Sequence, residues 1–271
     1  MDKTVRQRGL TGPGHLVFAL TLVGLGIIGL FRHGSIPIWN PIPKWAPYHD
    51  QLPWLFLAIT LVGGAGLLWR RTAALASRLL LAAFLVAWLA FRVRAAVMTP
   101  TTVVYWENVG EATTYVAAAW TLYACFGDDW DRRIGFAVDD SGLRIARALF
   151  GLAMVAFGFA HLAYVSYTAS LVPKWLPGHE GWVIFTGWGY ILAGVGILTS
   201  VAARLAATLV AWQIFGFTLL VWAPQVWAGS KDPSVWGETL VSWTLTACAW
   251  VVAESYRGAR WLGEFPADDR A

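Results

Sequence analysis

Charged residues are scarce in this sequence. Asp, Glu, Lys and Arg make up 13% of its 271 residues, against about 25% in a typical soluble domain. Hydrophobic residues make up 58%. A folded chain of this size keeps a large exposed surface, and too few polar side chains are present to cover it. The shortage argues against a water-soluble fold and favours a protein whose apolar surface faces lipid.

Cysteine is also scarce, and the common motifs of catalysis are missing. Cys125 and Cys248 each stand alone in an apolar run, so no C-x-x-C pair supports a thiol–disulfide relay. We find no phosphate-binding loop, dinucleotide fingerprint, nucleophile elbow or haem-attachment motif. Metal ligation has little support, because Asp50 and Glu180 are the main oxygen donors near the histidines. The sequence therefore indicates no catalytic residue and no metal ligand, and whether the chain is an enzyme stays open.

Long apolar runs dominate the sequence instead, each near the roughly 20 residues that a helix needs to cross a bilayer. Trp is abundant, with 18 residues, and its ring favours the membrane–water interface. The first run lacks the short apolar core and cleavage site of a signal peptide, so we expect it to remain as a span. The runs predict eight transmembrane helices, near residues 15–32, 53–69, 73–91, 106–126, 145–167, 181–199, 203–223 and 236–254.

The basic residues predict how these spans are oriented. Alternating the spans places 14 Lys and Arg residues on one side and 6 on the other. Loops rich in Lys and Arg stay in the cytoplasm, so both the N- and C-termini are expected there. Because the basic residues form no continuous face, nucleic-acid binding is not expected. We expect the lipid bilayer as a partner, with a membrane redox protein or a second copy of the chain as further candidates.

The sequence also repeats itself at an offset of 130 residues. Residues 43–47 (PKWAP) recur as residues 173–177 (PKWLP), and the glycine-rich run 64–68 aligns with 194–198. Each copy holds four predicted spans, so both copies have the same orientation in the membrane. We therefore expect an all-α, multi-pass transmembrane fold with eight helices in two parallel-repeated four-helix bundles. Glycines in the second and sixth spans predict close helix packing.

Domain boundaries follow from this repeat. The first unit covers residues 1–126, and a charged cytoplasmic linker at 127–143 joins it to the second unit at 144–256. A polar cytoplasmic tail follows at 257–271. A charged run such as the linker is usually solvated.

Several short motifs of the second unit match a known family pattern. They are R-I-A-R at 144–147, F-A-H at 159–161, V-P-K-W-L-P-G-H at 172–179, F-T-G at 185–187 and Y-I-L-A-G at 190–194. In these motifs the second unit resembles the DoxX-like family of bacterial integral membrane proteins, and residues 15–126 resemble a degraded copy. The resemblance implies a compact four-helix bundle per unit and a place in the bacterial cytoplasmic (inner) membrane. Some relatives are subunits of thiosulfate:quinone oxidoreductases, others accompany redox maturation, and most have no assigned activity. If the chain is redox-linked, we expect it to be an accessory subunit.

Candidate ligand-binding residues lie in the second unit, which keeps the family pattern. His161 stands in an otherwise apolar helix, and an ionisable side chain in a span usually faces the bundle interior or a wet cavity. His49 and His179 have the alternative of hydrogen bonding locally within Pro-rich turns. The full set of candidates is His161, Tyr164, Pro173, Trp175, Pro177, His179, Glu180, Thr186, Tyr190, Trp222 and Trp236.

Two further interpretations bear on this set. Each Pro-Lys-Trp-x-Pro segment is either a stiff interfacial anchor for the next span or a lid over a cavity between the helices. Arg92 and Arg94 end the third span, and we expect them to pair with Glu107 and Glu111 at the start of the fourth.

Three functions are compatible with these features. The first is a membrane subunit that binds a small hydrophobic molecule near the outer leaflet, with a quinone as one candidate cofactor. The second is a non-catalytic structural or accessory membrane protein. The third is a transporter or channel, for which no span supplies a clear charged pathway.

Overall fold

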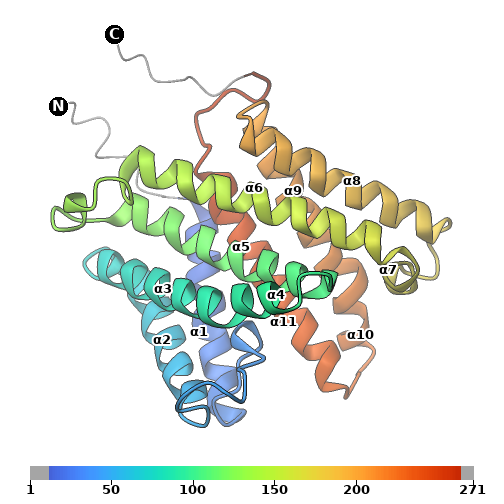
Figure 1. Ribbon diagram of the computed structural model, residues 1–271, viewed down its shortest axis with the longest axis horizontal. Helices are drawn as coiled ribbons and strands as arrows, with labels where there is room; N and C mark the ends of the chain where they lie inside the picture. Colours follow the sequence, from blue (N-terminus) through green and yellow to red (C-terminus); the bar gives the residue numbers. More distant parts are fainter. Residues whose placement is uncertain (1–11, 264–271) are drawn as a thin grey trace.

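The computed structural model describes residues 12–263, and every regular element in that range is a helix (Figure 1). This confirms the predicted all-α class. Two π-helical turns, η3 (Trp88–Val93) and η5 (Thr218–Trp222), continue one helix into the next, and the 3-10 turns η2 (Pro37–Trp39) and η4 (Asp131–Arg133) lie in loops. The α-helices are α1 (Pro13–Phe31), α2 (Leu52–Leu67), α3 (Ala73–Ala87), α4 (Arg94–Met98), α5 (Val103–Phe126), α6 (Asp139–Ala163), α7 (Val165–Leu171), α8 (His179–Leu198), α9 (Ala203–Phe217), α10 (Ala223–Trp227) and α11 (Pro233–Glu254).

Five helical segments in the described range are long and apolar enough, by length and composition, to cross a membrane. The other three predicted spans also form helices, but α2 has only 16 residues. Helices α5 and α11 are long enough, yet their Glu, Ser and Thr residues lower the mean hydropathy. These findings support a membrane protein with several apolar helices. The five segments are Pro13–Phe31, Ala73–Met98, Asp139–Ala163, His179–Leu198 and Ala203–Trp227.

Four helix boundaries differ from the sequence-based expectation. Helix α6 begins at Asp139, inside the stretch expected to be a linker. It ends at Ala163 because Tyr164, at φ −118° and ψ 41°, leaves the helical conformation and starts the separate helix α7. The third and seventh segments run on to Met98 and Trp227, because a π turn lets each helix continue past its expected end.

Local structure recurs at the same offset as the sequence. Residues 60–68 and 190–198 show the same order of buried, half-buried and exposed positions. Three pairs of elements also begin at this offset: α3 and α9 at Ala73 and Ala203, η3 and η5 at Trp88 and Thr218, and α5 and α11 at Val103 and Pro233.

One end of the molecule gathers the start of α1, the α2–α3 turn, the α5–α6 linker, the α8–α9 turn and the end of α11 (Figure 1). The loop before α2, helix α7 and the loop before α11 lie toward the opposite end. Hydrogen bonds tie the first end together: Gly14 N donates to Glu254 Oε1 at 3.1 Å, and Arg204 Nη1 donates to the Ala259 carbonyl at 2.7 Å. Successive long segments therefore run back and forth between the two ends. Lys3, Arg6, Arg8 and Arg270, which contribute to the predicted orientation, lie outside the described residues.

Close packing between α6 and α8 depends on glycine. A Cβ added at Gly194 would lie 2.6 Å from the Gly151 carbonyl oxygen, and one added at Gly158 would lie 2.6 Å from the Gly187 oxygen. These distances are shorter than real Cβ contacts, so only glycine allows the two backbones to approach this closely. The small residues of the sixth span thus bring α8 against α6, as the sequence predicts.

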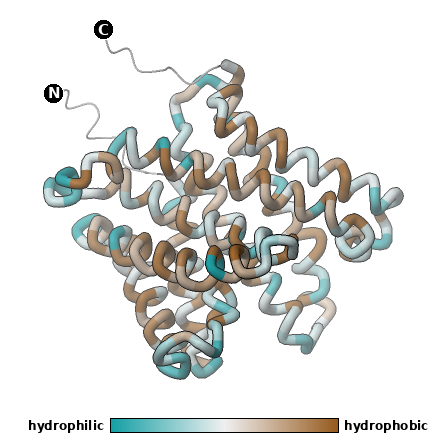
Figure 2. The backbone as a smooth tube through the Cα atoms, viewed as in Figure 1, coloured by the Kyte–Doolittle hydropathy of each residue, from teal (hydrophilic) through white to brown (hydrophobic). Residues whose placement is uncertain are grey.

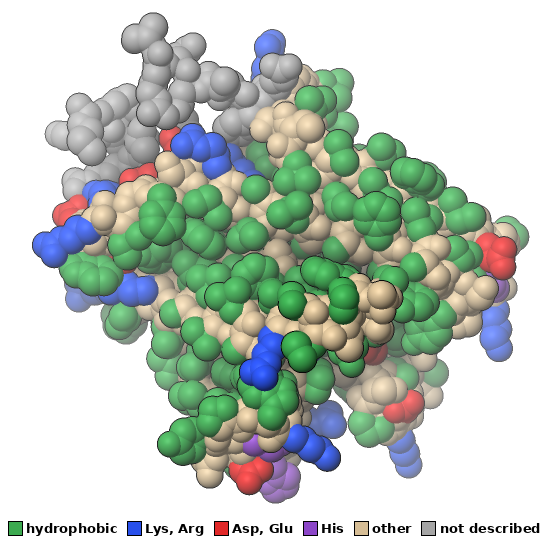
Figure 3. Space-filling view, viewed as in Figure 1, with side chains coloured by type: hydrophobic (Ala, Val, Ile, Leu, Met, Phe, Trp, Pro, Cys, Tyr) green, Lys and Arg blue, Asp and Glu red, His purple; other side chains and the backbone are tan. Residues whose placement is uncertain are grey.

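The outer surface of the helices is apolar. Hydrophobic residues run along the helices, while hydrophilic residues gather in the turns at their ends (Figure 2). Hydrophobic side chains also spread over the face formed by α6 and α8, and charged side chains lie mainly near its edges (Figure 3). Leu75, Val86 and Leu192 are each more than 60% exposed. A soluble monomer rarely exposes apolar surface on this scale, whereas lipid would cover it.

One residue of the charged linker departs from the expected solvated state. Asp131 is fully buried, and its Oδ1 accepts hydrogen bonds from Arg78 Nε and from the Tyr123 hydroxyl, both at 2.9 Å. Burial raises the pKa of Asp131. The Arg78 guanidinium, the Asp128 N–H and the Tyr123 hydroxyl together outweigh burial and lower the pKa below its ordinary value. This carboxylate therefore fastens the linker to α3 and α5.

Candidate functional site

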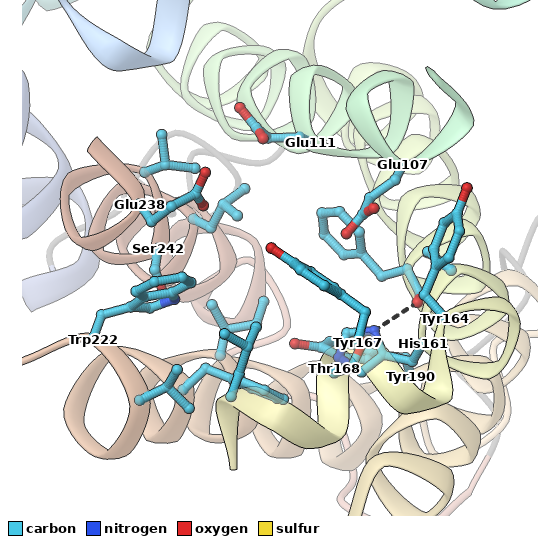
Figure 4. A pocket seen from close by; sticks show the side chains of 18 of the residues that line it. Glu107, Glu111, His161, Tyr164, Tyr167, Thr168, Tyr190, Trp222, Glu238 and Ser242 are labelled. Carbon is cyan, nitrogen blue, oxygen red and sulfur yellow. Dashed lines mark hydrogen bonds between the residues drawn. The ribbon is translucent and has the colours of Figure 1, made fainter. Parts of the chain in front are cut away.

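A cavity of about 660 Å³ lies between α5, α6, α7, α8, α9, η5 and α11, at the end of the molecule that holds α7 (Figure 4). Its volume falls within the range of small-molecule sites, about 300–1,000 Å³. Helix α5 precedes residues 127–143 and the other elements follow them, so both halves of the chain contribute to the wall.

Three carboxylates line this cavity, and two of them lack a protein partner. Glu107 and Glu111 stand one turn apart on α5, which puts both on the same face of the helix, and Glu238 faces them from α11 (Figure 4). Glu111 Oε1 accepts a hydrogen bond from the Tyr115 hydroxyl at 2.9 Å. Within residues 12–263, neither Glu107 nor Glu238 makes a hydrogen bond or an ion pair. Glu107 is half-buried and Glu238 is exposed, and both line the cavity. An ionisable side chain inside a membrane bundle usually pairs with a partner, so these two indicate a site that takes a ligand.

The arginines expected to pair with these carboxylates are engaged elsewhere. Arg94 lies over the Trp45 ring, with its guanidinium carbon 4.0 Å from the ring centroid. Arg92 donates a hydrogen bond to the Asn40 carbonyl. Because both arginines turn toward the loop before α2, the expected Arg–Glu pairs do not form in the described structure.

His161 lines the cavity and has one buried nitrogen that is free to accept a hydrogen bond. Its Nδ1 lies 2.9 Å from the Phe157 carbonyl oxygen, which can only accept, so Nδ1 carries the proton. Nε2 is buried and has no hydrogen-bond partner among the described residues. The ring is held in this orientation by Tyr190 and Phe217, whose centroids lie 5.2 and 5.5 Å away. In its neutral form, His161 therefore keeps a lone pair without a partner.

Aromatic rings form much of the remaining wall. Phe157 and Tyr190 pack edge to face at 5.9 Å, and Tyr190 stacks with Phe217 at 6.5 Å. Trp222 lies in the wall because the π turn η5 widens the helix just before α10. A flat or chain-like apolar body can pack on these rings.

Helix α7 forms the rim of the cavity. The break at Tyr164 redirects the chain, so that Tyr164, Tyr167 and Thr168 line the cavity. Tyr167 points toward the centre in Figure 4 and is 69% exposed. The neighbouring Pro-Lys-Trp-Leu-Pro segment lines no part of this cavity. Its position favours the anchor interpretation over the lid.

The structure brings four of the sequence-predicted candidates together in this cavity: His161, Tyr164, Tyr190 and Trp222. The other candidates lie outside the lining. Thr186 donates to the Trp182 carbonyl at 2.9 Å, and Trp236 donates to the Ser230 carbonyl at 2.9 Å. The remaining five surround the turn at the start of α8, and they are Pro173, Trp175, Pro177, His179 and Glu180.

The corresponding region of the first unit is filled. Trp39, carried on η2, stacks between Phe56 and Phe84 at centroid distances of 4.3 and 4.7 Å. Its indole N–H donates to Thr60 Oγ1 at 2.8 Å. The cavity beside it measures only about 10 Å³. The two units therefore differ where a ligand would bind, and the second unit has the space.

The lining residues also bear on the chemistry available here. In residues 12–263, no group of three or more His, Cys, Asp or Glu side chains is placed to hold a metal ion. Cys125 and Cys248 are both unpaired thiols in this range. The cavity can accept hydrogen bonds, hold positive charge and stack on flat groups.

Comparison of the chain with protein-family models, with curated proteins and with solved structures finds no match. The resemblance to the DoxX-like family therefore stays a prediction.

Sequence reasoning missed the three carboxylates as site residues. Two acidic residues four apart in an apolar run signal a shared helix face, and Glu238 lies at the position that corresponds to Asn108 on α5. The spacing of Glu107 and Glu111 could have indicated a site, but the expected pairs with Arg92 and Arg94 accounted for both acids without a ligand.

Proposed function

We propose that this chain is an integral membrane protein that binds a small, partly apolar molecule in the cavity of its second unit. The observation that carries this proposal is the 660 Å³ cavity, whose lining includes Glu107, Glu238 and His161. Among residues 12–263, neither carboxylate has a hydrogen-bond or ion-pair partner, and His161 Nε2 has no hydrogen-bond partner. A ligand with polar and apolar parts would meet these groups and the aromatic wall together. Ligand binding accounts for the cost of keeping ionisable groups inside a membrane bundle.

The membrane architecture belongs to the same proposal. We infer eight spans, with α2, α5 and α11 joining the five clearly apolar segments, in two parallel copies of a DoxX-like bundle. Helices α5 and α11 supply many of the buried residues, so their polar side chains meet other helices more than lipid. We place the protein in a bacterial inner membrane with both termini cytoplasmic. The cavity would then lie near the outer leaflet.

A quinone is one molecule of suitable size, and a redox complex is one setting for it. The Tyr164 and Tyr167 hydroxyls on the rim can donate hydrogen bonds to quinone carbonyls. In that setting the chain would act as an accessory subunit that holds the quinone.

Native mass spectrometry of the protein purified in mild detergent tests the proposal. Thr168→Phe adds a ring inside the cavity rim, and Ser170→Phe adds the same ring on the exposed side of the same helix. We expect the wild type and Ser170→Phe to retain a bound small molecule that Thr168→Phe loses. If all three proteins carry the same molecules, or none carries any, the cavity is not the binding site.

A further inference from the structure

The cavity has a chemical bias that narrows the class of ligand. We propose that it binds a small organic cation, namely a protonated amine attached to an aromatic or alkyl body. This inference rests on the proposed function, because it names the kind of molecule held in the same cavity.

Charge is the first argument. Glu107, Glu111 and Glu238 line the cavity, while none of the described lining residues is Lys or Arg. Arg92 is near enough to act electrostatically on Glu111, but it donates to the Asn40 carbonyl and lies outside the lining. Glu107 and Glu238 also act on each other as like charges. A cation between them would relieve this repulsion and supply the missing partner for each carboxylate.

Hydrogen-bonding direction is the second argument. With its Nδ1 proton committed to the Phe157 carbonyl, neutral His161 presents an acceptor at Nε2. The carboxylates accept as well when they are ionised, so together with His161 they favour a hydrogen-bond donor. A protonated amine has N–H donors and positive charge in one group. Quinone carbonyl oxygens only accept, so they could pair with the rim hydroxyls of Tyr164 and Tyr167 but not with these acceptors.

The aromatic wall is the third argument. Tyr190, Phe217 and Trp222 line the cavity, and a cation is attracted to the face of an aromatic ring. The apolar body of an amine can pack on the same rings. Cavity shape, charge and hydrogen-bonding direction therefore favour the same class of ligand.

Isothermal titration calorimetry with three probes of similar size tests this inference. The probes are phenylbutylammonium, which is cationic, phenylbutanol, which is neutral, and phenylbutyrate, which is anionic. Detergent micelles without protein serve as the blank for partitioning. We expect saturable binding of phenylbutylammonium that is at least about tenfold tighter than binding of phenylbutanol, and no saturable binding of phenylbutyrate.

Variants locate the charge that is responsible. Glu107→Gln and Glu238→Gln keep the side-chain shape, and each should weaken phenylbutylammonium binding by about tenfold or more. Their affinity for phenylbutanol should change far less than their affinity for phenylbutylammonium. Glu180→Gln is the control, because Glu180 is exposed at the start of α8 and lies outside the lining. Thermal melting of each variant checks that it is folded.

The outcomes separate this inference from the proposed function. If phenylbutanol binds as tightly as the ammonium, or if both Gln variants keep full affinity, the ligand is not selected by charge. The proposed function then survives, provided that Thr168→Phe still loses its bound molecule. If the molecule that the purified protein retains has no basic nitrogen, the proposal that the ligand is a cation is also wrong. If no probe binds and mass spectrometry finds no retained molecule, both proposals fail.

Discussion

The indole N–H of Trp39 donates a hydrogen bond to Thr60 Oγ1 over 2.8 Å, inside the first four-helix unit. Thr60 and Tyr190 occupy equivalent positions in the two copies, and Tyr190 lines the large cavity of the second. Trp39, which lies in the loop before α2, thus fills the region that corresponds to the large cavity. In the second copy α7 turns toward the rim, and the space stays available.

This arrangement predicts that Trp39 is a major source of stability. Trp39→Ala should lower the free energy of unfolding by about 3–5 kcal/mol, because it removes a buried ring and leaves a cavity between Phe56 and Phe84. Thermal melting in detergent measures the change. Trp45→Ala is the control, since Trp45 is 51% exposed, and it should cost far less. Equal melting temperatures for the two variants would contradict this role for Trp39.

The contrast between the two units shows which features of the fold and the site can be predicted from the sequence alone. Apolar runs predicted the helices, and the matching PKW motifs predicted the correspondence between copies, because both depend on short-range pattern. The filling of one bundle by Trp39 depends on how the loop before α2 folds back, which no local pattern encodes. The same loop turns Arg92 toward Asn40 and leaves Glu111 facing the cavity. His161 was recognisable because an ionisable residue in an apolar helix is costly wherever the chain goes.

Close packing of α6 against α8 gives a second prediction. Gly194→Ala places a methyl group against the Gly151 carbonyl and should destabilise the protein by about 1–3 kcal/mol. Gly216→Ala is the matched control, since a Cβ there meets nothing within 4 Å. That change should be neutral or slightly stabilising, because alanine favours helix more than glycine does. Chemical denaturation in detergent compares the two, and a similar loss in both would show that helix contact is not the cause.

Asp131 predicts how stability depends on pH. Its pKa is lower in the folded protein, so its pairing with Arg78 stabilises the fold above the unfolded pKa, near 3.9. That contribution is lost as the pH falls through the lowered folded value. Asp131→Asn should lower the free energy of unfolding by about 2 kcal/mol at neutral pH. Below about pH 4, the stability of this variant should fall less steeply with decreasing pH than that of the wild type. Melting temperatures between neutral and acidic pH measure both effects.

Asp129→Asn is the control for this substitution, because the Asp129 side chain is 85% exposed and forms only a surface pair with Arg132. We expect it to follow the wild-type pH profile. If Asp131→Asn matches the wild type at every pH, the buried pair does not fasten the linker.

Cysteine labelling tests the proposed orientation in the membrane. In a Cys125→Ala, Cys248→Ala background, Trp175→Cys reports on the loop before α8, and Phe136→Cys reports on the linker between the units. Both native side chains are more than 60% exposed, so a cysteine at either position is open to reagent. A membrane-impermeant maleimide added to intact cells should label Trp175→Cys and spare Phe136→Cys until the membrane is opened. Labelling of Phe136→Cys in intact cells would invert the orientation, and labelling of both would place the two loops on the same side. Labelling of Phe136→Cys without labelling of Trp175→Cys would move the cavity away from the outer leaflet, because the cavity lies at the same end of the molecule as the loop that carries Trp175.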